Sequence, residues 1–586
     1  MAITKSTLGL SVREKDNRST GDLPLTPARA KKWLAELPIA NVTETANLYY
    51  QYLRQVNSLI LDPADRLKLM LQVCPTTDYL VESIGESYSQ RPVSLSERRR
   101  QAADQVQALL TETVIGFNTA IESAVTDPGV SDRVRKKTAP TAIACAIYYL
   151  SRIQLQRYQL YRPVGNRIWR EIHSLFLLAE RNEWLDQKVN TTILPDTSIR
   201  TQYHRSLLLA LSRPYERRPG ESVLLFAALT DYAGGLVLKD RMDTDYHYAV
   251  NPEIDLPPQP LSSVPETEPE AWRSLDLQPA IRQLESGLEQ QRTGWLNRRK
   301  SRPSSLDPHL NRQLVDAWSE IKSRTFLRIH SDVPARICVG LNASCALLAE
   351  QFAHDQGWHN LLSVTDKDDK FAAELVEIDP QDNRSNFQWK HYPGENEPRE
   401  DVFASIYQPR QAKDETPQQK PVVRTPKSYN WSDAVISNAS PAGLCLRVLD
   451  NQPAYTEANE IITITYDNDV GETNVSVGII RWARWINDKE LLIGVELQAP
   501  QAVPVKTCVQ PEHGSPKYRH SGLLLPALKS VGLNATIITA PINYQEGDQV
   551  LVKTPGAKLK VRLGKLLFRT ENYFQFSYQE ESKAAD

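Results

Sequence analysis

Five residues in two short motifs have the chemistry to recognise a phosphorylated purine. The first motif is Arg324-Thr-Phe-Leu-Arg328, and the second is Asn438-Ala-Ser440-Pro-Ala-Gly443. The planar fork of arginine can donate two hydrogen bonds to O6 and N7 of guanine or to phosphate oxygens, and it can also stack on a base. Two arginines on a loop, with an amide and a hydroxyl on a strand, therefore predict a ligand that carries guanine edges and phosphates.

The strands that must position these residues can be read around the motifs. Asn438 and Ser440 are two positions apart, so on a strand both side chains point to one face. Gly443 allows the backbone to approach a ligand closely. An apolar run follows each motif, at 335–341 and at 444–448, and each run predicts a strand.

The order of the two motifs, with a strand behind each, resembles the PilZ family of bacterial cyclic di-GMP receptors. The resemblance implies a six-stranded antiparallel barrel that binds cyclic di-GMP through Arg324, Arg328, Asn438, Ser440 and Gly443, with no metal and no other cofactor. Asn438 stands where the family more often has Asp. The motifs lie 110 positions apart (438 minus 328), farther than is usual in the family, which implies an insertion at about 342–428.

Other arginines are weaker candidates for the site. The RxxxR spacing also occurs at 213–217 and at 298–302, so the spacing alone does not identify a site. Arg481 and Arg484 flank Trp482 on a predicted strand, where they could close over the ligand. A solvated strand surface is the simpler interpretation of these three residues.

Composition narrows the class of protein. A chain of 586 residues is too long for one core, and a net charge of -2 with a pI of about 6.6 argues against a general nucleic-acid binder. The six cysteines are scattered without a CxxC motif, which is typical of buried thiols in a reducing compartment. The chain has no apolar signal segment, no metal-ligand spacing and no GxSxG or Walker A sequence. We therefore expect a cytoplasmic bacterial protein without a transmembrane segment and without enzymatic activity.

The patterning predicts several domains. Apolar residues recur every three or four positions in the first half, as in Leu48, Tyr52 and Val56, whereas alternation dominates after Gly443. The helical part fits either a repeat array or a compact bundle. The expected fold is an all-α N-terminal array, a PilZ-like six-stranded antiparallel barrel with an insertion, and a second small β domain. The expected segments are a disordered start (1–24), a helical domain (25–250), a linker and helix (251–305), the barrel (306–500, insertion 342–428) and the second β domain (501–586).

These features favour a non-enzymatic cyclic di-GMP receptor whose helical half engages an unidentified protein partner. One alternative is an adaptor that binds no ligand and keeps a degenerate barrel. A third hypothesis, an RNA-binding protein built from small barrels, conflicts with the acidic pI and with the lack of basic and aromatic stacking surfaces.

Overall fold

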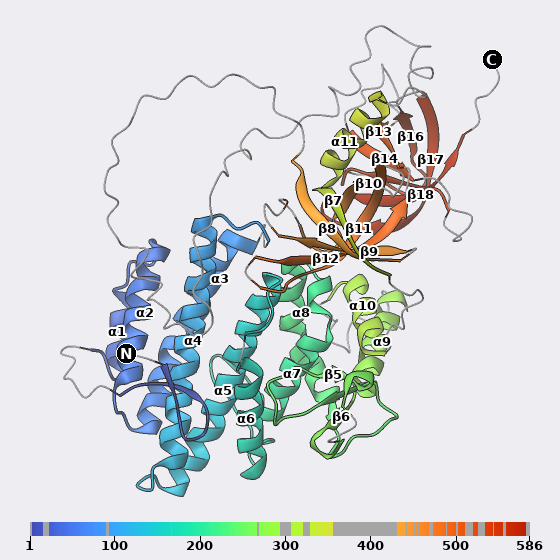
Figure 1. Ribbon diagram of the computed structural model, residues 1–586. Helices are drawn as coiled ribbons and strands as arrows, with labels where there is room; N and C mark the ends of the chain where they lie inside the picture. Colours follow the sequence, from blue (N-terminus) through green and yellow to red (C-terminus); the bar gives the residue numbers. More distant parts are fainter. Residues whose placement is uncertain are drawn as a thin grey trace, which may run out of the picture. The chain divides into compact units, whose positions relative to one another are not determined.

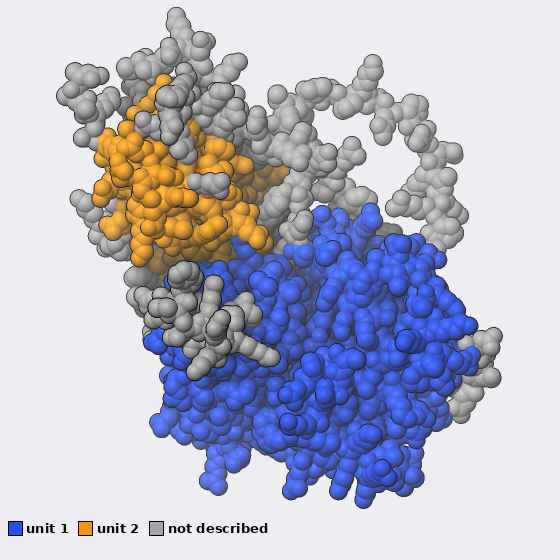
Figure 2. All heavy atoms as spheres, turned by 180° about the vertical axis from the view of Figure 1, so that it is seen from behind, with its two compact units in different colours: residues 1–323, 391–411 blue, residues 324–390, 412–586 orange. Residues whose placement is uncertain are grey.

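The computed structural model describes most of the chain (Figure 1). The described residues are 3–15, 23–89, 93–165, 167–265, 269–293, 306–319, 329–354, 430–440, 442–449, 453, 456–467, 473–487, 489–499, 502–509, 520–525, 534–542, 544–554 and 558–581. They divide into two compact units, one ending at residue 319 and the other starting at residue 329 (Figure 2). The first unit is mainly helical and the second contains two β-barrels.

Helices dominate the first unit because capped amphipathic segments follow one another along the chain. Thr26 caps the first helix, whose first residue is Pro27, and Asn41 caps the second by accepting from the Glu44 backbone N–H. The long helices α3, α4 and α5 pack side by side around a continuous apolar core. The helices are α1 Pro27–Ala35, α2 Val42–Ser58, α3 Pro63–Ser89, α4 Glu97–Thr126, α5 Asp132–Gln159, α6 Ile168–Arg181, α7 Ile199–Leu211, α8 Pro219–Tyr232, α9 Gln278–Thr293 and α10 Pro308–Ser319, with short 3-10 turns at Pro214–Glu216, Ala233–Gly235, Leu261–Ser263 and Pro269–Ala271.

Residues 3–15 form ordered structure, which differs from the expectation of disorder over residues 1–24. Strands β1 (Ile3–Lys5) and β2 (Ser11–Arg13) form an antiparallel hairpin. The hairpin is held to the helices because Arg13 is buried in an ion pair with Glu112 of α4 and Leu10 is buried in the apolar core. The residues that hold the hairpin are far from it in the sequence, so the sequence pattern alone does not predict that this polar segment is ordered.

The proline-rich stretch at 251–276 was expected to be an extended linker, and two short segments of it instead complete a small sheet. The sheet has the order β3-β6-β4-β5. Its second and third strands bury Ser274, Leu275 and Val250. Pro260 lies on the edge strand, where the missing N–H costs no ladder hydrogen bond. The strands are β3 Val237–Leu238, β4 Tyr248–Val250, β5 Gln259–Pro260 and β6 Arg273–Asp276.

The second unit begins with a closed six-stranded barrel, as the family resemblance implies. All neighbouring strands are antiparallel in the order β10-β11-β12-β9-β8-β7, and β7 closes the ring on β10. The first strand covers Ile329–Val339, so it begins six positions earlier than the expected 335–341 and ends before Gly340, whose φ is 104°. The other strands are β8 Ser432–Ser440, β9 Gly443–Val448, β10 Ile461–Asp467, β11 Thr473–Trp485 and β12 Leu491–Ala499.

The chain between β7 and β8 is an insertion, because these two strands pair directly with each other. It opens with helix α11 (Leu341–His354), while residues 355–429 lie outside the described part. The helix packs against β7 and β10 of the first barrel and against β13 and β14 of the second. Its buried Leu347 and Leu348 therefore belong to one apolar cluster that both barrels share.

The second barrel is also closed and antiparallel, in the order β13-β14-β15-β18-β17-β16. Its last three strands agree with the sequence pattern, and the first three were not anticipated. The strands are β13 Val503–Val509, β14 His520–Leu525, β15 Thr536–Thr539, β16 Gln549–Lys553, β17 Lys558–Arg569 and β18 Phe574–Glu580.

Candidate functional site

The register of the first barrel brings the neighbourhoods of the two motifs together. Arg324 and Arg328 lie outside the described residues. The residue that follows them, Ile329, pairs with Ala439, and His330 pairs with Asn438. The residue after the arginine motif therefore lies beside the second motif, although 110 positions separate Arg328 from Asn438 (438 minus 328).

The second motif forms the end of β8 and the start of β9. The Ser440 hydroxyl donates to the Gly443 carbonyl at 3.1 Å, and these two residues also pair across the strands. A Cβ at position 443 would lie 2.5 Å from the Val495 carbonyl oxygen, so this position requires glycine. The Asn438 Oδ1 is buried and has no hydrogen-bond partner among the described residues. A buried acceptor without a partner is costly, which makes it a candidate to receive a ligand donor.

A row of four residues in register continues from Asn438 across the sheet. Asn438 pairs with Cys445, Cys445 with Gly494, and Gly494 with Trp482, on β8, β9, β12 and β11. The alternate residues of these strands, including Leu446 and Ile493, are fully buried. Paired residues point to the same face, so the row lies on the outer face of the barrel, where Cys445 itself is only 5% exposed.

Trp482 lies flat on this outer face because Gly494 leaves room for it. A Cβ at position 494 would be 2.1 Å from the indole Nε1 and 2.2 Å from Cε2. The face therefore offers an aromatic surface at one end of the row and an amide at the other. Such a surface can stack a base whose edge is hydrogen-bonded nearby.

Arginines lie on both sides of this row. On one side, Arg447 is 3.6 Å from Asp332 and 3.4 Å from Glu490, and its buried Nε has no partner among the described residues. On the other side, Arg481 forms an ion pair with Glu496, whose backbone pairs with Gly443. Guanidinium groups around an aromatic and an amide can bind phosphate and guanine together.

The described residues hold no cluster of three or more His, Cys, Asp or Glu side chains that could bind a metal ion. No helix in the described part of the chain is long and apolar enough to cross a membrane.

Three family models match the chain in succession. Residues 28–242 match the N-terminal domain of the cyclic-di-GMP receptor FimW, residues 247–504 match its middle PilZ domain, and residues 507–581 match its C-terminal β-barrel domain. The chain belongs to the PilZ-domain family. Its similarity extends to a whole receptor: the cyclic-di-GMP receptor FimW of Pseudomonas aeruginosa is 26% identical over 580 residues, which are 98% of this chain and 93% of that protein. No solved structure gives a significant match.

The family assignment agrees with the resemblance in the sequence. Sequence reasoning took Trp482 and its two flanking arginines as a solvated strand surface. It missed Gly494 and Arg447, because their place depends on which strands are neighbours. A bulge between Ile480 and Trp482 shifts the alternation of β11, so Trp482 lies on the outer face although it stands two positions after the buried Ile480.

Proposed function

We propose that this PilZ-domain protein is a non-enzymatic receptor for cyclic di-GMP, with Arg324, Arg328, Asn438, Ser440 and Gly443 as its binding residues. The observation that carries the proposal is the pairing of Ile329 with Ala439, which places the residue that follows Arg328 beside the second motif. The similarity to a named cyclic-di-GMP receptor over nearly the whole chain supports the same ligand.

The chemistry of each group suits one part of the dinucleotide. The Asn438 carbonyl oxygen is an acceptor for the N2 amino group of guanine, and its amide N–H groups can donate to the guanine acceptors. Trp482 supplies a face on which a guanine can stack, and the arginines neutralise the two phosphodiesters. Asn438 carries no charge, so it adds no repulsion toward these phosphates.

Isothermal titration of the full chain with cyclic di-GMP tests this proposal. We expect binding by the wild type and a loss of at least about tenfold in affinity for Arg324→Ala/Arg328→Ala, because both guanidinium groups are removed. Arg298→Ala/Arg302→Ala is the matched control, since it removes the same charges at the same spacing. The absence of binding by the wild type, or equal losses in the two double variants, would rule the assignment out.

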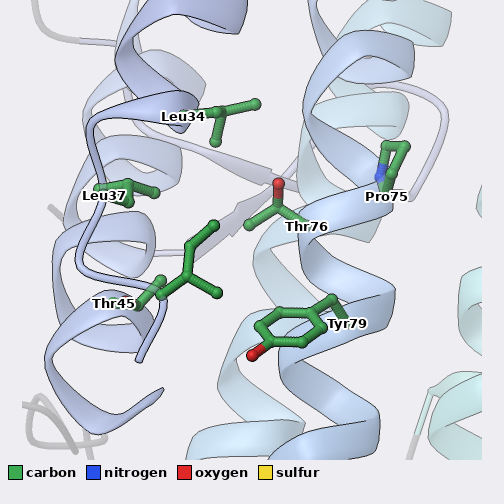
Figure 3. Close-up of a pocket in the computed structure, with 7 residues that line it drawn as sticks. Leu34, Leu37, Thr45, Pro75, Thr76 and Tyr79 are labelled. Atoms are coloured by element: carbon green, nitrogen blue, oxygen red, sulfur yellow. The ribbon is translucent and has the colours of Figure 1, made fainter. Parts of the chain in front are cut away.

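The helical unit is the proposed binding region for a protein partner. A cavity of about 310 Å³ opens between α1, α2 and α3 and is lined almost entirely by apolar groups (Figure 3). Ile39 and Tyr79, which line the cavity, are 50% and 42% exposed, and Leu48 of α2 is 43% exposed. These features suit an amphipathic partner helix that inserts one large apolar side chain.

Pull-down of interacting proteins in the presence and absence of cyclic di-GMP tests the partner proposal. Ile39→Asp should reduce retention of the proteins that the wild type captures, because it places a charge at the rim of the cavity. Ile3→Asp, at another exposed isoleucine, should leave retention unchanged. A cytoplasmic location is part of the proposal, since all six cysteines are free and buried.

A further inference from the structure

Arg481 occupies an exceptional position on β11. The register between β11 and β12 shifts between Ile480 and Trp482, so Arg481 is the extra residue of a β-bulge. A bulge turns its side chain away from the regular alternation of the strand. Here it points the guanidinium toward the edge of the proposed ligand face and, at the same time, toward the second barrel.

Two contacts hold Arg481 in this place. Its Nε donates to the Glu496 carboxylate, and the two side chains remain 36% and 46% exposed. Its guanidinium carbon also lies 5.8 Å from the centre of the Phe568 ring, on β17 of the second barrel. Because Glu496 pairs with Gly443, the ion pair lies next to the second motif.

Phe568 connects this contact to the core shared by the barrels. Its ring stacks on Tyr573 with centroids 6.1 Å apart. Tyr573 is fully buried in the apolar cluster that also contains Leu347 of α11 and Ile479 of β11. Arg481 is therefore in contact with the proposed ligand face on one side and with the packing between the barrels on the other.

We propose that Arg481 is a third arginine of the dinucleotide site, and that it leaves Glu496 and Phe568 when it binds a ligand phosphate. The inference rests on the proposed function. A phosphodiester competes with a carboxylate for the same planar fork, and the ion pair between Arg481 and Glu496 is exposed enough for the carboxylate to be exchanged. In the free protein Arg481 of β11 contacts Phe568 of β17. Binding of the dinucleotide removes this contact and so weakens the packing between the two barrels.

Charge removal at Glu496 tests the competition. Glu496→Gln removes the competing carboxylate and a charge that repels the phosphates, so we expect about fivefold to tenfold tighter binding of cyclic di-GMP in titration calorimetry. Asp467→Asn is the matched control, because it removes the same charge at the far end of β10 in the same barrel. Unchanged affinity in Glu496→Gln, or an equal gain in Asp467→Asn, would overturn the competition.

Hydrogen exchange over residues 570–580 of the full chain tests the link to the second barrel. In the wild type we expect cyclic di-GMP to raise the exchange rate of this segment. In Arg481→Ala the rate should already be raised without ligand and should not respond to it. Arg481→Lys should behave in the same way, because lysine keeps the charge and loses the planar fork. A ligand response of normal size in Arg481→Ala would overturn the link.

The two proposals can fail separately. If the wild type binds and Arg324→Ala/Arg328→Ala does not, the receptor function stands, and the variants at Glu496 and Arg481 alone decide the inference. If the wild type does not bind cyclic di-GMP, the receptor function and the inference both fall.

Discussion

Two glycines determine the shape of the candidate site on the outer face of the first barrel. Gly443 leaves the backbone bare at the second motif, and Gly494 makes room for the Trp482 indole. Alanine at either position would bring its Cβ within 2.5 Å of the neighbouring atoms. The shape of the candidate site therefore depends on residues that carry no functional group.

We predict that Trp482 contributes a stacking surface to dinucleotide binding. Trp482→Ala should weaken cyclic di-GMP binding by about 1–3 kcal/mol, as is typical of one lost base–aromatic stack. Trp482→Phe should keep part of the affinity because it keeps an aromatic ring. Calorimetric titration measures both effects, with Ile486→Ala, at an exposed residue on the same hairpin, as the control. Equal affinity for Trp482→Ala and the wild type would remove Trp482 from the site.

At the scale of elements, buried charge holds the N-terminal hairpin in place. Arg13 and Glu112 are 5% and 2% exposed, and the Asn57 amide donates to the same carboxylate at 3.0 Å. Removing one member of a buried ion pair leaves the other charge unpaired. Loss of either Arg13 or Glu112 should therefore destabilise the packing of the hairpin on the helices.

We predict that Arg13→Ala lowers the free energy of unfolding of the helical unit by about 3–5 kcal/mol, the usual cost of breaking a buried pair. Urea unfolding followed by circular dichroism at 222 nm measures the change. Arg13→Met/Glu112→Gln should recover much of the loss, because neither charge then remains buried. A loss below about 1 kcal/mol in Arg13→Ala would show that water solvates Glu112 when Arg13 is absent.

Two buried histidines in neighbouring helices give the helical unit its expected pH dependence. Burial lowers the pKa of His173 and of His204 from 6.5 to about 4. The His173 ring is therefore neutral at pH 7. Its Nε2 donates to the Leu256 carbonyl at 2.9 Å, which leaves Nδ1 to accept from the Tyr203 hydroxyl at 3.0 Å. The unfolded chain binds protons at these residues between pH 6.5 and pH 4, whereas the folded chain does not. Stability is therefore lost as the pH falls through this window.

Each histidine should lower the free energy of unfolding by about 3 kcal/mol as the pH falls from 7 to 4. Burial raises the pKa of Asp78 to about 6, and this carboxyl opposes the histidines over part of the window, since there the folded state holds the extra proton. His204→Gln should reduce the acid-induced loss in urea unfolding, and His309→Gln, at an exposed residue, should not. Identical pH profiles for the wild type and His204→Gln would contradict the assignment.

At the scale of the molecule, helix α11 makes the two barrels share one core. Leu347 is 1% exposed in a cluster that includes Ile461 of the first barrel and Leu523 of the second. The Cys345 thiol also donates to the Gly522 carbonyl of the second barrel at 3.2 Å. The barrels are therefore expected to unfold as one cooperative unit.

We predict that Leu347→Ala destabilises both barrels by about 2–5 kcal/mol, because it leaves a cavity in the shared core. Hydrogen exchange of β11 and of β18 should rise together in this variant. Leu567→Ala, at a leucine that is 49% exposed on the second barrel, should change neither strand. A rise confined to one of the two strands would show that the barrels unfold independently.

The sequence by itself determined the local features of this protein. Alternation located β10, β11, β12 and the last three strands, and helical spacing and caps located the array, because these signals come from residues within a few positions of each other. The two motifs also indicated the family. The strands β13, β14 and β15 were missed, and the boundaries drawn at 250, 305 and 500 stay predictions.

The tertiary structure decided what depends on partners far apart in the chain. Only barrel closure sets β7 against β8 and aligns Asn438, Cys445, Gly494 and Trp482 in one row. Only the fold gives Arg13 its buried carboxylate and turns Arg481 between Glu496 and Phe568. Strand order and burial arise from contacts between distant segments, and neither the spacing of residues nor their propensities encode which segments meet.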